Sequence, residues 1–268
     1  MKKMTKVLLI LAAIFIVIGG IITAIGVFLG GHTAIGWDKE KHKFVTADDR
    51  YYVTGEKTKI NEFKNIDIDL DMESVTLIPS DDFYIEYAVY SYDKNVVPYS
   101  LKNGTLKVEV SDKFFVFDLF DWNGKKNEDT YINIYYPKEM DFESLNLDLD
   151  MGSFEVSECN FDSISAKLDM GSFTAKDCYL GKTDIDLDMG SLDLYNVSLA
   201  KLDANLDMGS AEITLLQDGK NDYGYDLKVD MGSIEINGED EGSKYKVDGD
   251  NDIIIDCDMG DIEIKEKW

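Results

Sequence analysis

The sequence predicts an all-β protein: a single β-solenoid with coils of about 19 residues, preceded by one N-terminal transmembrane helix. Three observations predict this fold. The tetrad Asp-Met-Gly-Ser begins at residues 150, 169, 188 and 207, at a constant spacing of 19. Apolar and polar side chains alternate around each tetrad, which is typical of strands with one buried face. A run without charged side chains, residues 7–29, stands near the N-terminus.

The N-terminal segment has the length and flanks of a membrane anchor. At a rise of about 1.5 Å per residue, a helix over residues 7–29 would cross a hydrocarbon core of about 30 Å with some tilt. Three lysines lie in residues 1–6, so we expect a cytoplasmic tip there and the rest of the chain outside the cell membrane. A cleaved signal peptide is the alternative, but its apolar region is normally about 7–15 residues long. We therefore expect an uncleaved single-pass anchor.

Residues 30–62 are polar and weakly patterned, which is typical of a juxtamembrane stalk, with a short strand at residues 50–53. The β pattern begins at residue 63, and a degenerate tetrad, Asp-Met-Glu-Ser, begins at Asp71. Between it and residue 140 the pattern is irregular. We expect either further coils with decorated loops or a small sheet that caps the end of the solenoid.

Residues 141–268 carry the regular coils, with later tetrads at residues 230 and 258. The alternation predicts buried columns, with like residues about 4.8 Å apart in neighbouring coils. Extending it through the tetrad predicts an interior column of methionines. The tetrad glycine indicates a corner with positive φ, so the corner at Glu73 should be built differently. The columns comprise Leu149, Leu168, Leu187, Leu206, Val229 and Cys257, and Phe154, Phe173, Leu192, Ala211, Ile234 and Ile262.

The tetrad aspartates have two interpretations. Each carboxylate can accept a backbone N–H two residues on, forming an Asx turn. Alternatively, the row can bind calcium. Two carboxylates about 5 Å apart in water repel by less than about 1 kcal/mol, so turn hydrogen bonds could offset the repulsion without a metal. The calcium candidates, named the Asp row below, are Asp150, Asp169, Asp188, Asp207, Asp230 and Asp258.

A segment rich in aromatic residues, 114–122, interrupts the strand pattern. One interpretation is a hairpin folded over the coil. The other is an exposed patch that meets a partner protein, a glycan or the outer leaflet. The partner-binding candidates are Phe115, Phe117, Phe120 and Trp122.

The net charge narrows the classes of possible partners. The formal net charge is −26, and residues 1–6 hold three of the 27 basic groups, which leaves 24 against 53 acidic groups beyond them. Such a chain cannot bind nucleic acid through phosphates, whereas divalent cations and basic partners are favoured.

Cys159 and Cys178 share a repeat position, and Cys257 is a third, inward cysteine. We expect three buried free thiols.

The organisation resembles a bacterial putative-adhesin family of unknown function. The resemblance rests on the segment IDIDLDMESVTLIPS, the strand NGTLKVEV and the recurrent DMGS units. It implies a β-solenoid outside the membrane of Gram-positive-like bacteria, linked in some members to envelope-stress signalling. It implies no catalytic or ligand-binding residues.

We therefore expect a non-catalytic binding, adhesion or envelope-sensing module without a cofactor, whose partner is an envelope protein or a cell-surface polymer. A calcium-dependent adhesin is one alternative. A polysaccharide lyase or hydrolase is another, and it is less favoured because no histidine lies in the coils and Arg50 is the sole arginine. Ice or crystal binding is the least favoured, because the outward rows are Asp, Lys and Ser.

Overall fold

The computed structural model describes residues 50–110, 128–216 and 222–267 in full. Elsewhere it describes Phe15, Gly19 and Gly20, and the backbone of residues 34–38, 43–46 and 117–118. The chain divides into two compact units, residues 1–51 with 112–127, and residues 52–111 with 128–268.

In the first unit, three short strands form an antiparallel sheet. β1 (Ala34–Asp38) pairs with β2 (Lys43–Thr46) and with β9 (Phe117–Asp118). Phe15, Gly19 and Gly20 are helical, and the remainder of the predicted anchor, residues 7–29, lies outside the described residues. A search of the described part of the chain finds no helix with the length and hydropathy needed to cross a membrane.

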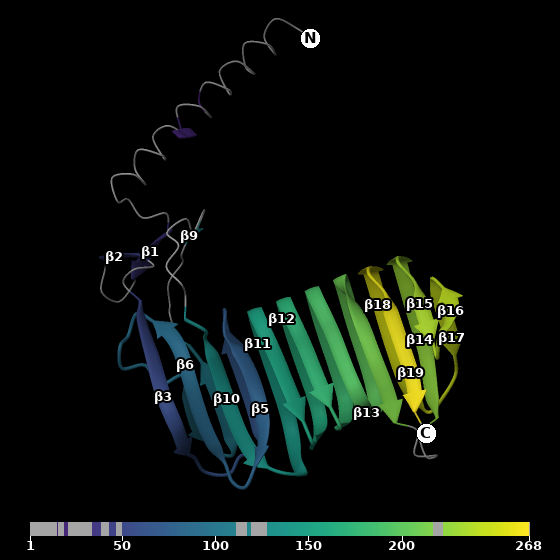
Figure 1. The fold of residues 1–268 in the computed structure, drawn as a ribbon, viewed down its shortest axis with the longest axis horizontal. Helices are drawn as coiled ribbons and strands as arrows, with labels where there is room; N and C mark the ends of the chain where they lie inside the picture. Colours follow the sequence, from purple (N-terminus) through teal and green to yellow (C-terminus); the bar gives the residue numbers. More distant parts are fainter. Residues whose placement is uncertain are drawn as a thin grey trace, which may run out of the picture. The chain divides into compact units, whose positions relative to one another are not determined.

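The second unit is a 16-stranded sheet with no helix in residues 52–110, 128–216 or 222–267. Its strands stand side by side in a long row (Figure 1). They are β3 (Tyr51–Lys59), β4 (Asn65–Leu70), β5 (Ser74–Ser80), β6 (Tyr84–Ser91), β7 (Tyr99–Lys102), β8 (Thr105–Glu109), β10 (Tyr131–Pro137), β11 (Met140–Ser157), β12 (Cys159–Lys176), β13 (Tyr179–Leu216), β14 (Tyr223–Met231), β15 (Ile234–Ile236), β16 (Glu239–Gly242), β17 (Lys244–Val247), β18 (Asn251–Met259) and β19 (Ile262–Lys267).

The regular strands are parallel and in register at the spacing of the repeat. β11 pairs with β12 so that Leu149 lies opposite Leu168 and Phe154 opposite Phe173. β12 pairs with β13 with the same offset of 19. Each of these long strands continues through its tetrad corner. The prediction that equivalent residues of neighbouring coils stack on one another is therefore confirmed for this part.

The order of the coils in space differs from their order in the sequence, which the sequence analysis did not anticipate. β18 and β19 lie between β13 and the outer pair β14 and β15. The outer coil then pairs antiparallel with β17 and β16. A strand edge left open would invite pairing with another chain. The lengthened interval between the last two tetrads supplies β16 and β17, the two strands that cover this edge.

The other end of the sheet contains both features that the sequence offered as alternatives, further parallel coils and a small group of strands that caps the end. β8 and β10 extend the parallel stack on β4 and β5. β7 and β6 then pair antiparallel with them, and β3 follows β6 at the edge. β3 falls inside the segment 30–62 that was predicted as a stalk, so the sheet begins about a dozen residues before the predicted boundary at residue 63.

The core runs continuously through the stack and is lined by the predicted inward columns. Phe142 stacks on Phe161 with ring centroids 5.1 Å apart, and Phe154 stacks on Phe173 at 5.2 Å. All four side chains are fully buried. Burying such a side chain contributes about 1.5–3 kcal/mol, and an aromatic pair adds about 0.5–1.5 kcal/mol. The core therefore holds the corners, where the polar rows lie, at fixed spacing.

Candidate functional site

The tetrad corners are tight because the backbones of successive coils touch there. Gly152, Gly171 and Gly190 have φ values of 149°, 151° and 148°. A Cβ added at Gly171 or Gly190 would lie 1.6 Å from the carbonyl oxygen of the preceding tetrad glycine. Positive φ, as predicted, is one reason for glycine, and this close approach is a second. At Glu73, where glycine is missing, the side chain is buried.

The methionines of the tetrads are exposed, and the prediction of an interior column is wrong. The exposed fractions are 39% for Met151, 40% for Met170 and Met189, and 43% for Met208. Inward positions in a strand differ by an even number of residues. Across the corner, however, the inward residues Leu149 and Phe154 are five apart. The glycine corner thus breaks the alternation, and Met151 points outward together with Asp150.

The Asp row also lies on the surface. Asp169 is half-buried and the other five aspartates are exposed. Lys167 Nζ lies 3.1 Å from Asp169 Oδ1, and Lys228 Nζ lies 3.1 Å from Asp230 Oδ1. Within the described residues, the carboxylates of the remaining four form neither an ion pair nor the expected Asx-turn hydrogen bond; these are Asp150, Asp188, Asp207 and Asp258.

The electrostatics of the row follow from this uneven pairing. Partial burial, followed by the neighbouring Asp169 and Asp148, raises the pKa of Asp150 above its usual value. The pKa of Lys167 is raised by its hydrogen bond to Asp169. Lys167 also attracts Asp188, without forming an ion pair with it. Carboxylates without an ion pair therefore lie on the neighbouring coils of Asp188, Asp207 and Asp258.

The row presents single carboxylates rather than a cage. A search of the described residues finds no group of three or more His, Cys, Asp or Glu side chains placed to hold a metal ion. Binding of calcium by the Asp row remains a prediction. The row can attract cations along its whole length, because like charges repeat in every coil.

The aromatic partner-binding candidates fall almost entirely outside the described residues. Phe115, Phe120 and Trp122 are not described. Phe117 lies in β9, where its backbone pairs with that of Ile35. The predicted recognition patch remains a prediction.

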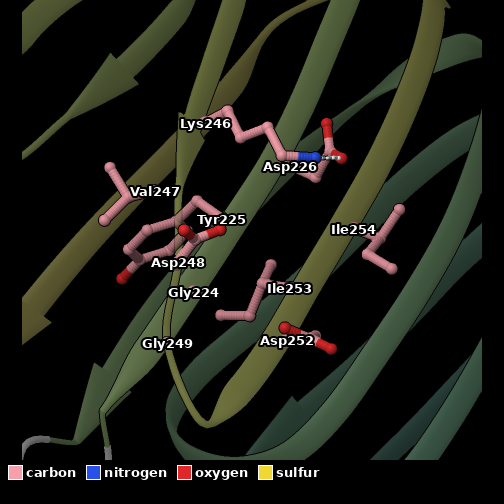
Figure 2. A pocket seen from close by; sticks show the side chains of 10 residues that line it. All are labelled: Gly224, Tyr225, Asp226, Lys246, Val247, Asp248, Gly249, Asp252, Ile253 and Ile254. Carbon is pink, nitrogen blue, oxygen red and sulfur yellow. Dashed lines mark hydrogen bonds and ion pairs between the residues drawn. The ribbon is translucent and has the colours of Figure 1, made fainter.

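A small pocket of about 240 Å³, which the sequence analysis missed, lies between β14, β17 and β18 (Figure 2). Lys246 and Asp226 form an ion pair at its wall, as the dashed line in Figure 2 shows. Asp248 and Asp252 add two carboxylates. Drug-sized ligands usually occupy pockets of about 300–1,000 Å³. In the sequence, only the acidic, glycine-rich composition of the last insertions indicated this pocket.

The three cysteines are free and buried, as predicted. Cys159 Sγ lies 4.0 Å from Cys178 Sγ. The hydrogen bond between these two thiols, followed by burial, raises the pKa of Cys159 far above its usual range. These thiols belong to the core and offer no exposed nucleophile.

Comparison with known proteins places the chain in a family. No curated protein matches it. A solved structure from Clostridium sporogenes ATCC 15579, described as a "putative cell adhesion protein", is 14% identical, with a TM-score of 0.42; the match covers 81% of this chain and 99% of that one. A "putative adhesin" from Bacteroides fragilis NCTC 9343 is also 14% identical, with a TM-score of 0.33 and coverages of 81% and 97%.

The family comparison covers most of the second unit. Residues 63–266, which include all seven tetrads, match the family described as Toastrack DUF4097. This match confirms the resemblance to an adhesin-like family of unknown function that the repeats indicated. The chain belongs to the Toastrack DUF4097 family.

Proposed function

We propose that this protein is a membrane-anchored, extracytoplasmic β-solenoid that acts as a non-catalytic binding, adhesion or envelope-sensing module. The observation that carries the proposal is the in-register repetition of exposed side chains at the corners, with Met151 opposite Met170 and Met170 opposite Met189. Such a surface offers the same group about every 4.8 Å. It suits a ligand that is itself repetitive, such as a cell-surface polymer, or a basic protein surface.

The charge of the sheet favours a cationic partner. Asp184, Asp186 and Asp188 are exposed in one strand, and the next coil adds Asp207. A field of one sign raises the local concentration of oppositely charged groups and weakens as salt is added. We therefore expect binding to depend on ionic strength.

Binding is tested with the full chain in mild detergent and fractions of the cell envelope. The chain with Asp186→Asn, Asp188→Asn and Asp207→Asn is the test variant, and the chain with three exposed lysines, Lys94, Lys102 and Lys244, changed to Gln is the control. Retention by the wild type and the control but not by the Asn variant supports the proposal. If the wild type retains no protein or polymer, with or without calcium, the proposal is wrong.

The membrane anchor is tested separately, in cells that carry the chain with a tag at either end. External protease should remove a C-terminal tag and leave an N-terminal tag intact, because the lysine-rich tip is expected inside. Release of the chain into the soluble fraction, or protection of both tags, would contradict the proposed orientation.

A calcium-dependent adhesin is the second candidate. It is favoured by the neighbouring carboxylates of Asp188, Asp207 and Asp258, none of which forms an ion pair within the described residues. A cation that binds the folded chain raises its melting temperature by mass action. The shift at millimolar calcium should disappear in the Asp188→Asn, Asp207→Asn variant. No shift in the wild type would remove calcium from the proposal.

Catalysis is not part of the proposal, because the exposed rows repeat one side chain instead of joining an unlike acid and base. Turnover of uronate-containing or cell-wall glycans by the purified chain would overturn this point and restore the polysaccharide-active alternative.

A further inference from the structure

Two residues never vary among the seven tetrads, and both lie on the surface at the corner. Glycine is replaced once, by Glu73, and serine once, by Asp261, whereas the Asp-Met pair is present in all seven. The backbone demands the glycine. It makes no comparable demand for methionine, whose side chain points outward. The seven exposed methionines, named the Met row, are Met72, Met151, Met170, Met189, Met208, Met231 and Met259.

Packing does not account for this constancy. The buried columns on either side of the corner accept several residue types, for example Leu168, Val229 and Cys257 in one of them. The exposed position accepts one. Methionine is not among the residues enriched in strands, and these partly exposed side chains gain less burial energy than the fully buried columns do. What distinguishes methionine from the aliphatic side chains is its polarizable thioether sulfur.

The stacking sets the spacing of these sulfurs. Met151 is paired with Met170 and Met170 with Met189; Met259 is paired with both Met208 and Met231. Gly209 packs against Gly190, so the coils of Met189 and Met208 are also neighbours. Neighbouring strands are about 4.8 Å apart. A metal–sulfur bond is about 2.3 Å long, so one ion lying between two successive thioethers spans about 4.6 Å.

The Asp row supplies the charge that such a site lacks. Thioethers are neutral, so a cation bound by them keeps its full charge and needs a nearby anion. Each tetrad aspartate immediately precedes a methionine of the Met row. Asp188, Asp207 and Asp258 form no ion pair within the described residues. Sulfur donors select soft cations such as Cu(I), whereas calcium takes oxygen ligands alone.

We propose that the Asp-Met ridge, formed by the Met row and its preceding aspartates, is a multi-site binding surface for the soft monovalent cation Cu(I). Each ion is held between the thioethers of neighbouring coils and balanced by the adjacent carboxylates. The central coils, with Met189, Met208 and Met259, are the strongest positions, because the preceding aspartates of these coils form no ion pair within the described residues. The inference does not depend on the adhesive role proposed above.

The first experiment follows the methionines directly. The full chain, labelled with ¹³C in the methionine methyl groups, is titrated in mild detergent with Ag(I), a redox-inert probe of the same chemistry. The sequence holds ten methionines, and Met1, Met4 and Met140 lie outside the Met row. The methyl signals of the Met row should move, with those of the central coils moving first, and the signals of these three should not. Unmoved signals from the Met row would overturn the proposal.

The second experiment measures Cu(I) affinity by competition with the chromophoric chelator bicinchoninate. The variant Met170→Leu, Met189→Leu, Met208→Leu, Met259→Leu keeps side-chain volume, a change that is usually well tolerated. Its affinity should fall more than about tenfold, while Met140→Leu, a change at a partly buried methionine outside the row, should leave affinity unchanged.

The same variants separate the thioethers from other ligands. Cys159, Cys178 and Cys257 are present in every variant, so unchanged affinity in the fourfold Leu variant would assign the metal to thiols or carboxylates and overturn the proposal. Complete displacement of Ag(I) by excess calcium would overturn it too, because the two ions would then share oxygen ligands. Retained affinity for Ag(I) in millimolar calcium supports it.

Discussion

Gly171 packs against Gly152 more closely than any other residue type would permit. A Cβ at Gly171 would stand 1.6 Å from the carbonyl oxygen of Gly152, which belongs to the backbone and has no free rotamer to adopt. The φ of Gly171, 151°, is in addition closed to L side chains at low energy. The contact fixes the height at which one coil rests on the next, and with it the spacing of the exposed rows.

We therefore predict that Gly171→Ala destabilises the chain by more than about 3 kcal/mol, since strained φ and backbone overlap act together. Gly104→Ala is the matched control, because Gly104 has φ 77° but no atom within 4 Å of an added Cβ. It should cost about 1 kcal/mol. The midpoint of urea unfolding, followed by circular dichroism, measures both. Equal midpoints would show that coil contact at the corner is unimportant.

The sequence predicted the features that local periodicity controls. The alternation around Leu149 and Phe154 identified the buried columns, and the spacing of 19 predicted the parallel register. The outward turn of Met151 could not be predicted in the same way. Period-two alternation places it inward, and the shift by one residue arises from the unusual backbone at Gly152, which only coordinates show.

The order in which the last two coils lie in the stack could not be predicted from the sequence either. Nothing local to Met231 or Met259 indicates which coil lies outside the other, because both coils have a glycine corner and apolar residues at the inward positions. The outer edge of the coil of Met231 is occupied by two strands of the last insertion, since β16 pairs with β15 and β17 pairs with β14, and the coil of Met259 returns on the inner side. Long intervals between repeats indicate an insertion, but tertiary contacts decide which strands the inserted strands pair with.

The aromatic stack between coils should contribute strongly to stability. Phe173 is fully buried and stacks on Phe154 at 5.2 Å. Phe173→Ala should cost about 3–5 kcal/mol, whereas Phe173→Leu should cost considerably less because most of the cavity is filled. Tyr179→Ala, at a 43% exposed side chain, is the control and should stay within about 0.5 kcal/mol of the wild type. The melting temperatures of the three variants are compared. If Phe173→Ala had the same melting temperature as the control Tyr179→Ala, the packing role of Phe173 would be contradicted.

The core thiols should resist alkylation in the folded chain. Thiolates react and thiols do not, and the pKa of Cys159 is held far above its usual range by its bond with Cys178 and by burial. Burial likewise raises the pKa of Cys257. The hydrogen bond with Cys159 lowers the pKa of Cys178, so the test is made on the other two thiols. Iodoacetamide labelling of Cys159 and Cys257 at pH 8, read by mass spectrometry, should be at least about a hundredfold slower in the folded chain than in urea. It should not accelerate between pH 7 and 9, and fast labelling of the folded chain would show that these sites open to solvent.

The raised pKa of Asp150 predicts a pH-dependent effect of Asp150→Asn. Burial, with Asp169 and Asp148 nearby, makes the folded chain bind this proton more readily than the unfolded chain does. The contribution of Asp150 to stability therefore falls as pH rises above about 4, where the unfolded aspartate ionises. Because Asp150 is largely exposed, Asp150→Asn should stabilise the chain at pH 7 by less than about 1 kcal/mol. Urea midpoints at pH 7 and below pH 4 measure the gain, which should vanish at the lower pH and exceed that of Asp162→Asn, an exposed control in β12.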